Sequence, residues 1–182
     1  MTGPASVGLA DPLGQSLCLE CGLCCRGVWF DRVVLDPGEV DDARAVGLSL
    51  QFEGGEASFR QPCVLHQRGR CSAYGKWRPR ICGEYRCALL ASFVAGKVDW
   101  PSALQRVTQA RQMADRIQAE IGHPPGGLMG PQVLGRVGGN DGPAPADLGP
   151  LSDSAKVETV ALVLFYKKHF RPPKDSDTAA NS

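Results

Sequence analysis

The segment CLECGLCC, residues 18–25, places four cysteines within eight residues. A C-x2-C-x2-C spacing lets three sulfurs from one tight loop converge on one centre, and Gly22 supplies the backbone freedom that such a loop needs. Thiolate sulfur is a ligand that zinc and iron–sulfur clusters both favour. The segment therefore predicts a fold held together by metal. The candidate ligands in it are Cys18, Cys21, Cys24 and Cys25.

Four further cysteines follow at wider spacing, and none comes after them: Cys63, Cys71, Cys82 and Cys87. Their spacing is too loose for a zinc finger, but it offers four more ligands. Cys24 and Cys25 are adjacent, and because neighbouring side chains tend to diverge, we do not expect both to bind one ion. The eight thiols match two four-thiolate sites, or one site with spare cysteines. His66 has ligand spacing after Cys63 but reads more readily as a turn residue.

Charge supports a buried anionic centre. Between Arg60 and Arg86 there are seven cationic residues and one acid, Glu84, a local charge of +6. A four-thiolate zinc or [4Fe-4S] centre is negatively charged, and cations around it would offset that charge and lower the pKa of the thiols. The alternative is a solvated basic face. The cations are Arg60, Arg68, Arg70, Lys76, Arg78, Arg80 and Arg86.

The compartment decides between metal and disulfides. The first 16 residues show no signal peptide, and the longest apolar run, residues 160–166, is far shorter than the roughly 20 residues of a transmembrane helix. We therefore expect a cytoplasmic protein without a transmembrane segment, where clustered cysteines favour metal or redox chemistry. Four disulfides, buried thiols without a ligand and nucleophilic thiols remain alternatives. A formal net charge of +1 indicates no nucleic-acid partner.

The fold class that we predict is α+β, a small metal-stapled domain with flanking helices. Within it we expect a strand over 27–35, a short helix over 36–47, a hairpin turning at Gly54-Gly55 and a helix beginning near Cys87. The predicted units are a flexible N-terminus (1–16), the cysteine domain (17–121), a Gly/Pro-rich linker (122–150) and a C-terminal helix with a disordered tail (151–182).

Two longer helices are predicted from apolar residues spaced three and four apart. The first covers 101–121, with Pro101 in its first turn and Ser102 with Gln105 as a capping box. The second covers 153–170. Its expected apolar face consists of Val157, Val160, Ala161 and Leu164.

The cysteine pattern resembles the CxxCxxCC family of zinc- or iron-chelating proteins. CLECGLCC matches the first half of its pattern, and PCVLHQRGRCSAYGKWRPRICGEYRC, residues 62–87, matches the second. The second half of the family pattern includes Pro-Cys, Cys-x-x-Tyr, Arg-Pro and the last two cysteines. All eight cysteines fall on the pattern, which covers about 70 residues.

The resemblance implies metal or iron–sulfur binding, and some members are labelled iron–sulfur oxidoreductases. It leads us to expect one or two [4Fe-4S] clusters held by the eight cysteines, with an electron-transfer or oxidoreductase role beside an unidentified protein partner. A Zn²⁺-binding structural or interaction module is the alternative. A larger relative is a flagellin lysine N-methylase, so a component of protein lysine N-methylation is a further alternative. We expect Tyr74, Trp77 and Tyr85 to pack around the metal.

Overall fold

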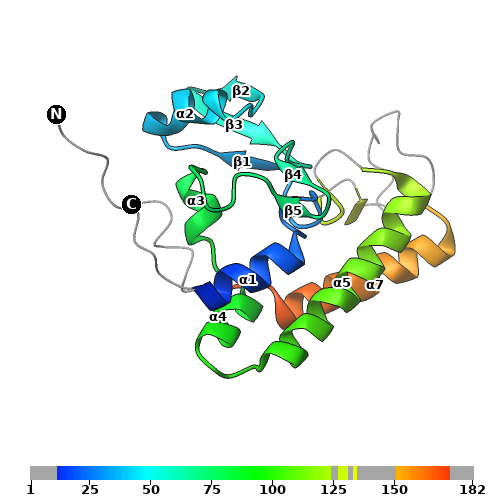
Figure 1. Cartoon of the computed structure of the whole chain (residues 1–182). Coiled ribbons are helices and arrows are strands. Elements are labelled where there is room, and N and C mark those ends of the chain that lie inside the picture. The colour runs from blue at the N-terminus through cyan, green and yellow to red at the C-terminus, as the bar shows by residue number, and fades with distance from the viewer. Residues whose placement is uncertain (1–11, 124–126, 131–132, 135–150, 173–182) are drawn as a thin grey trace.

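Most of the helices, including the two longest, lie on one side of the molecule, and two small antiparallel sheets with two short helices lie on the other (Figure 1). The computed structural model describes residues 12–123, 127–130, 133–134 and 151–172. This arrangement confirms the predicted α+β class. Within the described residues, no helix is both long enough and apolar enough to cross a membrane.

The elements follow the chain in alternating groups of helices and strands. The helices are α1 (Pro12–Cys21), the 3-10 helix η1 (Pro37–Glu39), α2 (Val40–Ala45), α3 (Arg80–Glu84), α4 (Ala88–Val94), α5 (Trp100–Ile121) and α7 (Asp153–His169). The strands are β1 (Arg32–Val34), β2 (Leu50–Glu53), β3 (Glu56–Arg60), β4 (His66–Gln67) and β5 (Arg70–Cys71).

The larger sheet has the strand order β1-β3-β2, with both neighbours antiparallel to β3. The hairpin β2–β3 turns at Gly54 and Gly55, whose φ angles of 59° and 87° suit glycine. This confirms the predicted hairpin. The sheet packs on α2 around a small core that we call the sheet core: Leu35, Ala43, Leu48, Ala57 and Phe59.

The strand expected over 27–35 is shorter than predicted. Only Arg32–Val34 pair with β3, because residues 27–30 turn away from the sheet. In that turn the side chains of Val28 and Trp29 are buried against helices instead. Apolar residues that read as a strand thus serve two different cores.

The helical side is built on α5. A carboxylate oxygen of Asp99 accepts the N–H of Ser102 at 2.8 Å and caps the helix. The predicted cap at Ser102 and Gln105 is therefore wrong, since the acid before the helix takes the first free N–H group. The helix itself and the position of Pro101 in its first turn are confirmed. The predicted short helices are also present, as η1–α2 and as α4 capped by Cys87.

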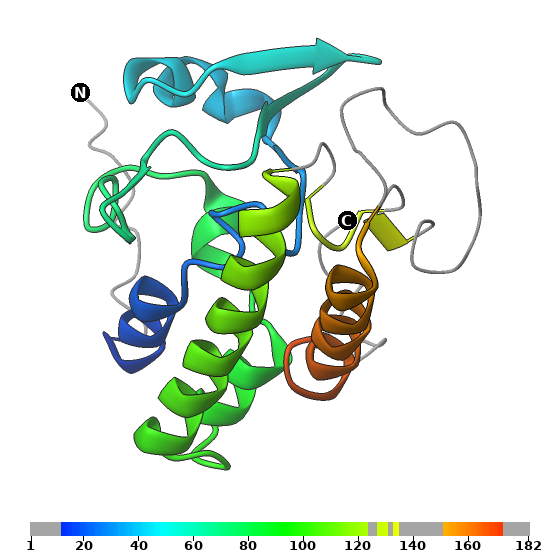
Figure 2. The same cartoon turned by 90° about the vertical axis from the view of Figure 1, so that its right-hand side faces the viewer.

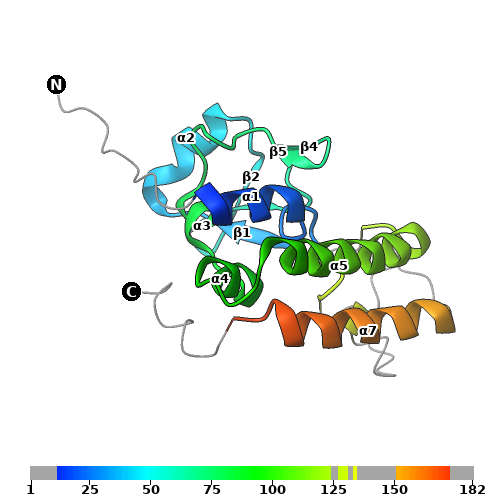
Figure 3. The same ribbon diagram turned by 60° about the horizontal axis from the view of Figure 1, so that its bottom comes forward.

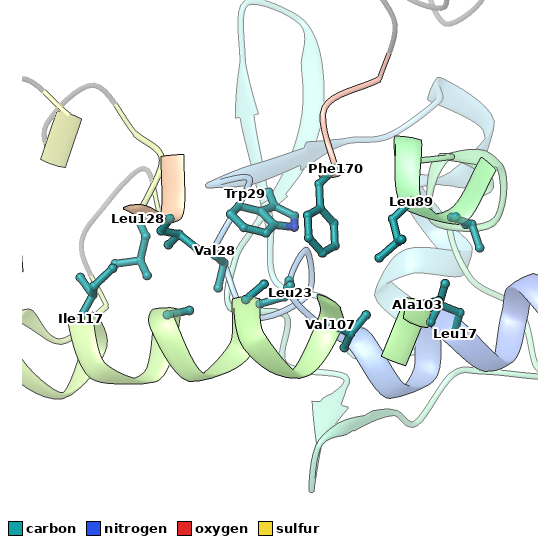
Figure 4. Close-up of a cluster of buried hydrophobic side chains, with 14 residues drawn as sticks. Leu17, Leu23, Val28, Trp29, Leu89, Ala103, Val107, Ile117, Leu128 and Phe170 are labelled. Atoms are coloured by element: carbon teal, nitrogen blue, oxygen red, sulfur yellow. The ribbon is translucent and has the colours of Figure 1, made fainter. Parts of the chain in front are cut away.

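Side chains from α1, α4, α5 and α7 meet around the turn at residues 23–30, forming what we call the helical core (Figure 4). In Figure 4 Leu23 and Val28 lie on the α5 side of the turn, and the Trp29 ring extends toward Phe170. The ring centroids of Trp29 and Phe170 are 5.3 Å apart. The turn is thus anchored to the helices by its own apolar side chains.

Helix α7 runs alongside α5 (Figures 2 and 3). Its buried residues are Ala155, Thr159 and Leu162, whereas Val157 and Leu164 of the predicted face are 69% and 60% exposed. The helix is confirmed, but the face assigned to the core is wrong. Small side chains at 155 and 159 allow the two helices to pack closely. The spacing of apolar residues alone does not reveal this face.

The predicted unit boundaries also differ from the structure. Helix α1 begins at Pro12, inside the segment expected to be flexible, because its later residue Leu17 is buried in the helical core. Residues 1–11 and 173–182 lie outside the described residues, as does most of the predicted linker. Within that linker Leu128 and Val133 are buried.

Candidate metal centre

The four N-terminal cysteines lie at the end of α1 and in the turn after it. Helix α1 ends at Cys21, and Gly22 then adopts a φ of 62°. Backbone hydrogen bonds from Gly22 N–H to Cys18 O (3.1 Å) and from Gly27 N–H to Cys24 O (3.1 Å) shape the turn. All eight cysteines lie within the described part of the chain, and no disulfide joins them there.

One set of four thiols consists of electrostatic neighbours, and three of them, Cys21, Cys24 and Cys87, also pack against the helical core. We call it the helical group: Cys18, Cys21, Cys24 and Cys87. Burial, followed by the negative charges of the Cys21 and Cys87 thiolates, raises the pKa of Cys24. Burial likewise raises the pKa of Cys21 to about 12 and that of Cys87 to about 11, with Cys18 adding repulsion in both.

A second set of thiols consists of Cys25 and its three strongest electrostatic neighbours. We call it the sheet group: Cys25, Cys63, Cys71 and Cys82. Burial raises the pKa of Cys25 to about 12, and the strongest repulsion comes from Cys82, Cys63 and Cys71, in that order. Neighbouring atoms dehydrate the thiol of Cys82, and this loss of hydration, together with Cys63 and Cys71, raises its pKa to about 12.

The adjacent residues Cys24 and Cys25 thus have different strongest thiol neighbours, although Cys25 also raises the pKa of Cys24 and Cys18 also raises that of Cys25. The backbone explains how the second group assembles around Cys25. The N–H of Cys63 donates to the carbonyl of Cys25 at 2.8 Å, which ties residue 63 to the turn. Cys71 lies opposite His66 in the β4–β5 pair, and Cys82 lies in the short helix α3.

Backbone N–H groups point at the sulfurs of both groups. The Cys63 thiol accepts hydrogen bonds from the N–H groups of Leu65 and His66, and these bonds counteract the rise in its pKa caused by burial. In the helical group, the Cys87 thiol accepts the N–H of Leu90 at 3.4 Å. Such bonds favour the thiolate, the form that binds metal.

The cations act differently from the prediction. We expected basic neighbours to lower the thiol pKa values, but burial and mutual repulsion outweigh them at each thiol with a resolved shift. Arg78 does lower the pKa of Cys82, as a smaller effect. Arg70 pairs with Glu20 at 3.0 Å, and Arg80 pairs with Asp36 at 2.7 Å. Part of the basic segment thus has structural partners.

The aromatic residues of the cysteine segment have separate neighbours. Trp77 packs against the sheet core. Tyr85 meets Phe30 edge-on, with ring centroids 5.3 Å apart, and Tyr74 lies under the guanidinium of Arg78. The expected packing of these rings around a metal stays a prediction.

His66 lies closer to the cysteine turn than its sequence context indicates. It lies in β4 rather than in a turn, and an added Cβ on Gly22 would be 2.7 Å from its Nε2 atom. That atom is buried and has no hydrogen-bond partner among the described residues. The C-x2-H spacing after Cys63 was the one sequence signal for this contact with the cysteine turn.

The two groups are sets of electrostatic neighbours, not completed coordination spheres. Within the described ranges, no three Cys, His, Asp or Glu side chains are arranged as a site that could hold a metal ion. A comparison of the chain with models of protein families, with curated proteins and with solved structures found no match. The residues themselves must therefore carry the functional argument.

Proposed function

We propose that the protein binds metal through two four-cysteine centres, each an iron–sulfur cluster of the [4Fe-4S] type, and serves in electron transfer or as an oxidoreductase component. The helical group would hold one cluster and the sheet group the other. The observation that supports this most is that the strongest thiol neighbours of Cys24 are Cys21 and Cys87, whereas those of Cys25 are Cys82, Cys63 and Cys71. Four thiolates are the usual ligand set of such a cluster.

The chemistry of the donors fits a metal better than it fits reactive thiols. Thiols whose pKa is raised to about 12, as in Cys21 and Cys25, stay protonated at neutral pH and are poor nucleophiles. Bound metal would replace those protons, and the N–H groups directed at Cys63 and Cys87 would support the resulting thiolates. Loading must also draw the sulfurs of each group together, so binding and final folding are coupled.

A bound cluster would supply one-electron redox chemistry. The protein side of that chemistry is burial of the sulfurs and their hydrogen bonds, both of which tune reduction potential. Each group includes one exposed residue, Cys18 or Cys82, although neighbouring atoms cover the Cys82 sulfur itself. These two residues would place an edge of each centre near the surface, where electron exchange with a protein partner requires it.

Zinc is the alternative, and one observation favours it. Cys63 begins a tight turn, in which the N–H of His66 donates to the carbonyl of Cys63 at 2.9 Å. The thiol of Cys63 accepts two further backbone N–H bonds. A short loop of this kind suits one end of a closed four-thiolate zinc site. In that case the protein would be a structural or interaction module without redox activity.

The test is anaerobic purification followed by iron, zinc and acid-labile sulfide analysis with a visible spectrum. We expect about four iron and four sulfide per centre and a brown chromophore that dithionite bleaches. Cys24→Ser and Cys25→Ser form a matched pair, because each removes one ligand from a different group. Each variant should retain about half of the wild-type metal.

The outcomes separate the alternatives. About two zinc ions and no colour would replace the iron–sulfur proposal with the zinc one. A wild-type protein without metal would refute both. Two results would contradict two separate centres: loss of all metal in both variants, or loss of metal in one variant with none lost in the other.

A further inference from the structure

Arg78 is a half-buried cation beside the sheet group. It lies on the segment between β5 and α3, and its Cζ atom is 4.2 Å from the centre of the Tyr74 ring. Its guanidinium also lies against Gly83, where an added Cβ would be 3.6 Å from Nη2. Tyr74 on one side and the backbone of α3 on the other thus fix the position of the charged group.

Arg78 differs from neighbouring arginines in what balances its charge. Arg80 is bound by the carboxylates of Asp36 and Glu84, and Arg26 by that of Asp115. Among the described residues, no carboxylate forms an ion pair with Arg78. A partly buried charge without a counter-ion is costly, so its position calls for another negative group nearby.

The sheet group would supply that negative charge once bound metal has replaced the protons of its thiols. Arg78 acts electrostatically on the Cys82 thiol, which follows it by four residues, and Gly83 holds the guanidinium next to α3. The four sulfurs of the sheet group repel one another when charged, and no other cation is resolved as acting on that set within the described residues.

We propose that Arg78 is the positioning and charge-compensating residue of the sheet-group centre, held by Tyr74 to balance the negative charge of the metal-loaded thiolates. This inference rests on the proposed function. The planar guanidinium stacks on the ring and keeps its charge at every accessible pH, which a flexible lysine ammonium does less well. Arg78 would act through Cys82 and would not bind the metal.

The test compares Arg78→Ala with Arg78→Lys and with the control Lys76→Ala. Lys76 is an exposed cation of the same segment, so its loss changes the net charge equally. The variants are made in the full chain carrying Cys24→Ser, which leaves the sheet group as the intact centre, and again in the Cys25→Ser chain. Circular dichroism of each variant establishes that it is folded.

The readouts are the rate of metal loss to a chelator and, for an iron–sulfur form, the reduction potential. Arg78→Ala should speed metal loss from the sheet-group centre about tenfold or more, as losses in the outer shell of a metal site do. It should also lower the reduction potential, because removing a nearby positive charge disfavours added negative charge. Arg78→Lys should recover most of the potential. Lys76→Ala should change the rate of metal loss less than about twofold and should leave the reduction potential nearly unchanged.

Two results would overturn the inference alone: Arg78→Ala behaving like Lys76→Ala in a metal-loaded protein, or equal effects on the two centres. Loss of stability in Arg78→Ala without a change in metal loss or potential would assign a merely structural role and also overturn it. A wild-type chain without metal would refute the proposed function, and this inference with it.

Discussion

Leu162 and Leu164 provide a direct test of how α7 is attached. The two leucines lie in the same helix, but Leu162 is 0% exposed in the helical core and Leu164 is 60% exposed. Truncation to Ala removes three carbons, worth about 2.4 kcal/mol of transfer free energy when fully buried, and the cavity raises the cost to about 3 kcal/mol or more. For Leu164 about two-fifths of the transfer term applies, about 1 kcal/mol, without a cavity.

The assay is urea and thermal unfolding followed by circular dichroism at matched metal content. In a chain of this size, about 3 kcal/mol lowers the melting temperature by roughly 6–12 °C, and Leu164→Ala should lower it by a few degrees at most. Equal losses in the two variants, or a larger loss for Leu164→Ala, would mean that α7 presents the other face to α5. A negligible loss in both would mean that α7 does not share the helical core.

Three further predictions concern the turn, a cap and an acid-sensitive pair. Gly127→Ala should cost about 2 kcal/mol or more in unfolding free energy, because φ is 67° and the new Cβ would overlap the Gly27 carbonyl oxygen; unchanged urea unfolding would contradict that close approach. Asp99→Ala should cost about 1 kcal/mol by the same assay, and no loss would mean that another group caps α5. The hydrogen bond from Arg80 lowers the pKa of Asp36 below 3.8, so its stabilising effect is complete above that value and is lost as pH falls through the folded-state pKa. Asp36→Asn should therefore flatten the decline of the urea midpoint below about pH 4, and an unchanged decline would exclude this pair as a cause.

Local chemistry accounts for the elements that the sequence predicted well. Two consecutive glycines specify the β2–β3 turn, because both residues need positive φ there. Pro37 and the acids after it specify the start of η1–α2, and the apolar spacing over 101–121 specifies α5. Each of these signals lies within a few residues of its effect, so a single sequence reveals it.

The parts that sequence reasoning missed depend on distant contacts. Residues 27–35 read as one strand, yet Trp29 turns to meet Phe170, about 140 residues away along the chain. Apolar spacing predicts one buried face for α7, whereas in the structure the residues buried by packing include Ala155 and Thr159. The membership of the two cysteine groups likewise depends on where β4–β5 and α3 lie in space.

The CLECGLCC segment lies between the helical core and the sheet core, and its cysteines have neighbours on both sides. The helical core and the sheet core share no residues. Cys21, Cys24 and Cys87 pack against the helical core, and Cys63 packs against the sheet core. Because Cys24 and Cys25 are joined by one peptide bond, metal bound to both groups would link two small cores, neither of which is large enough to add much stability alone. On this view the adjacent cysteines would be the point where bound metal holds the two halves of the domain together.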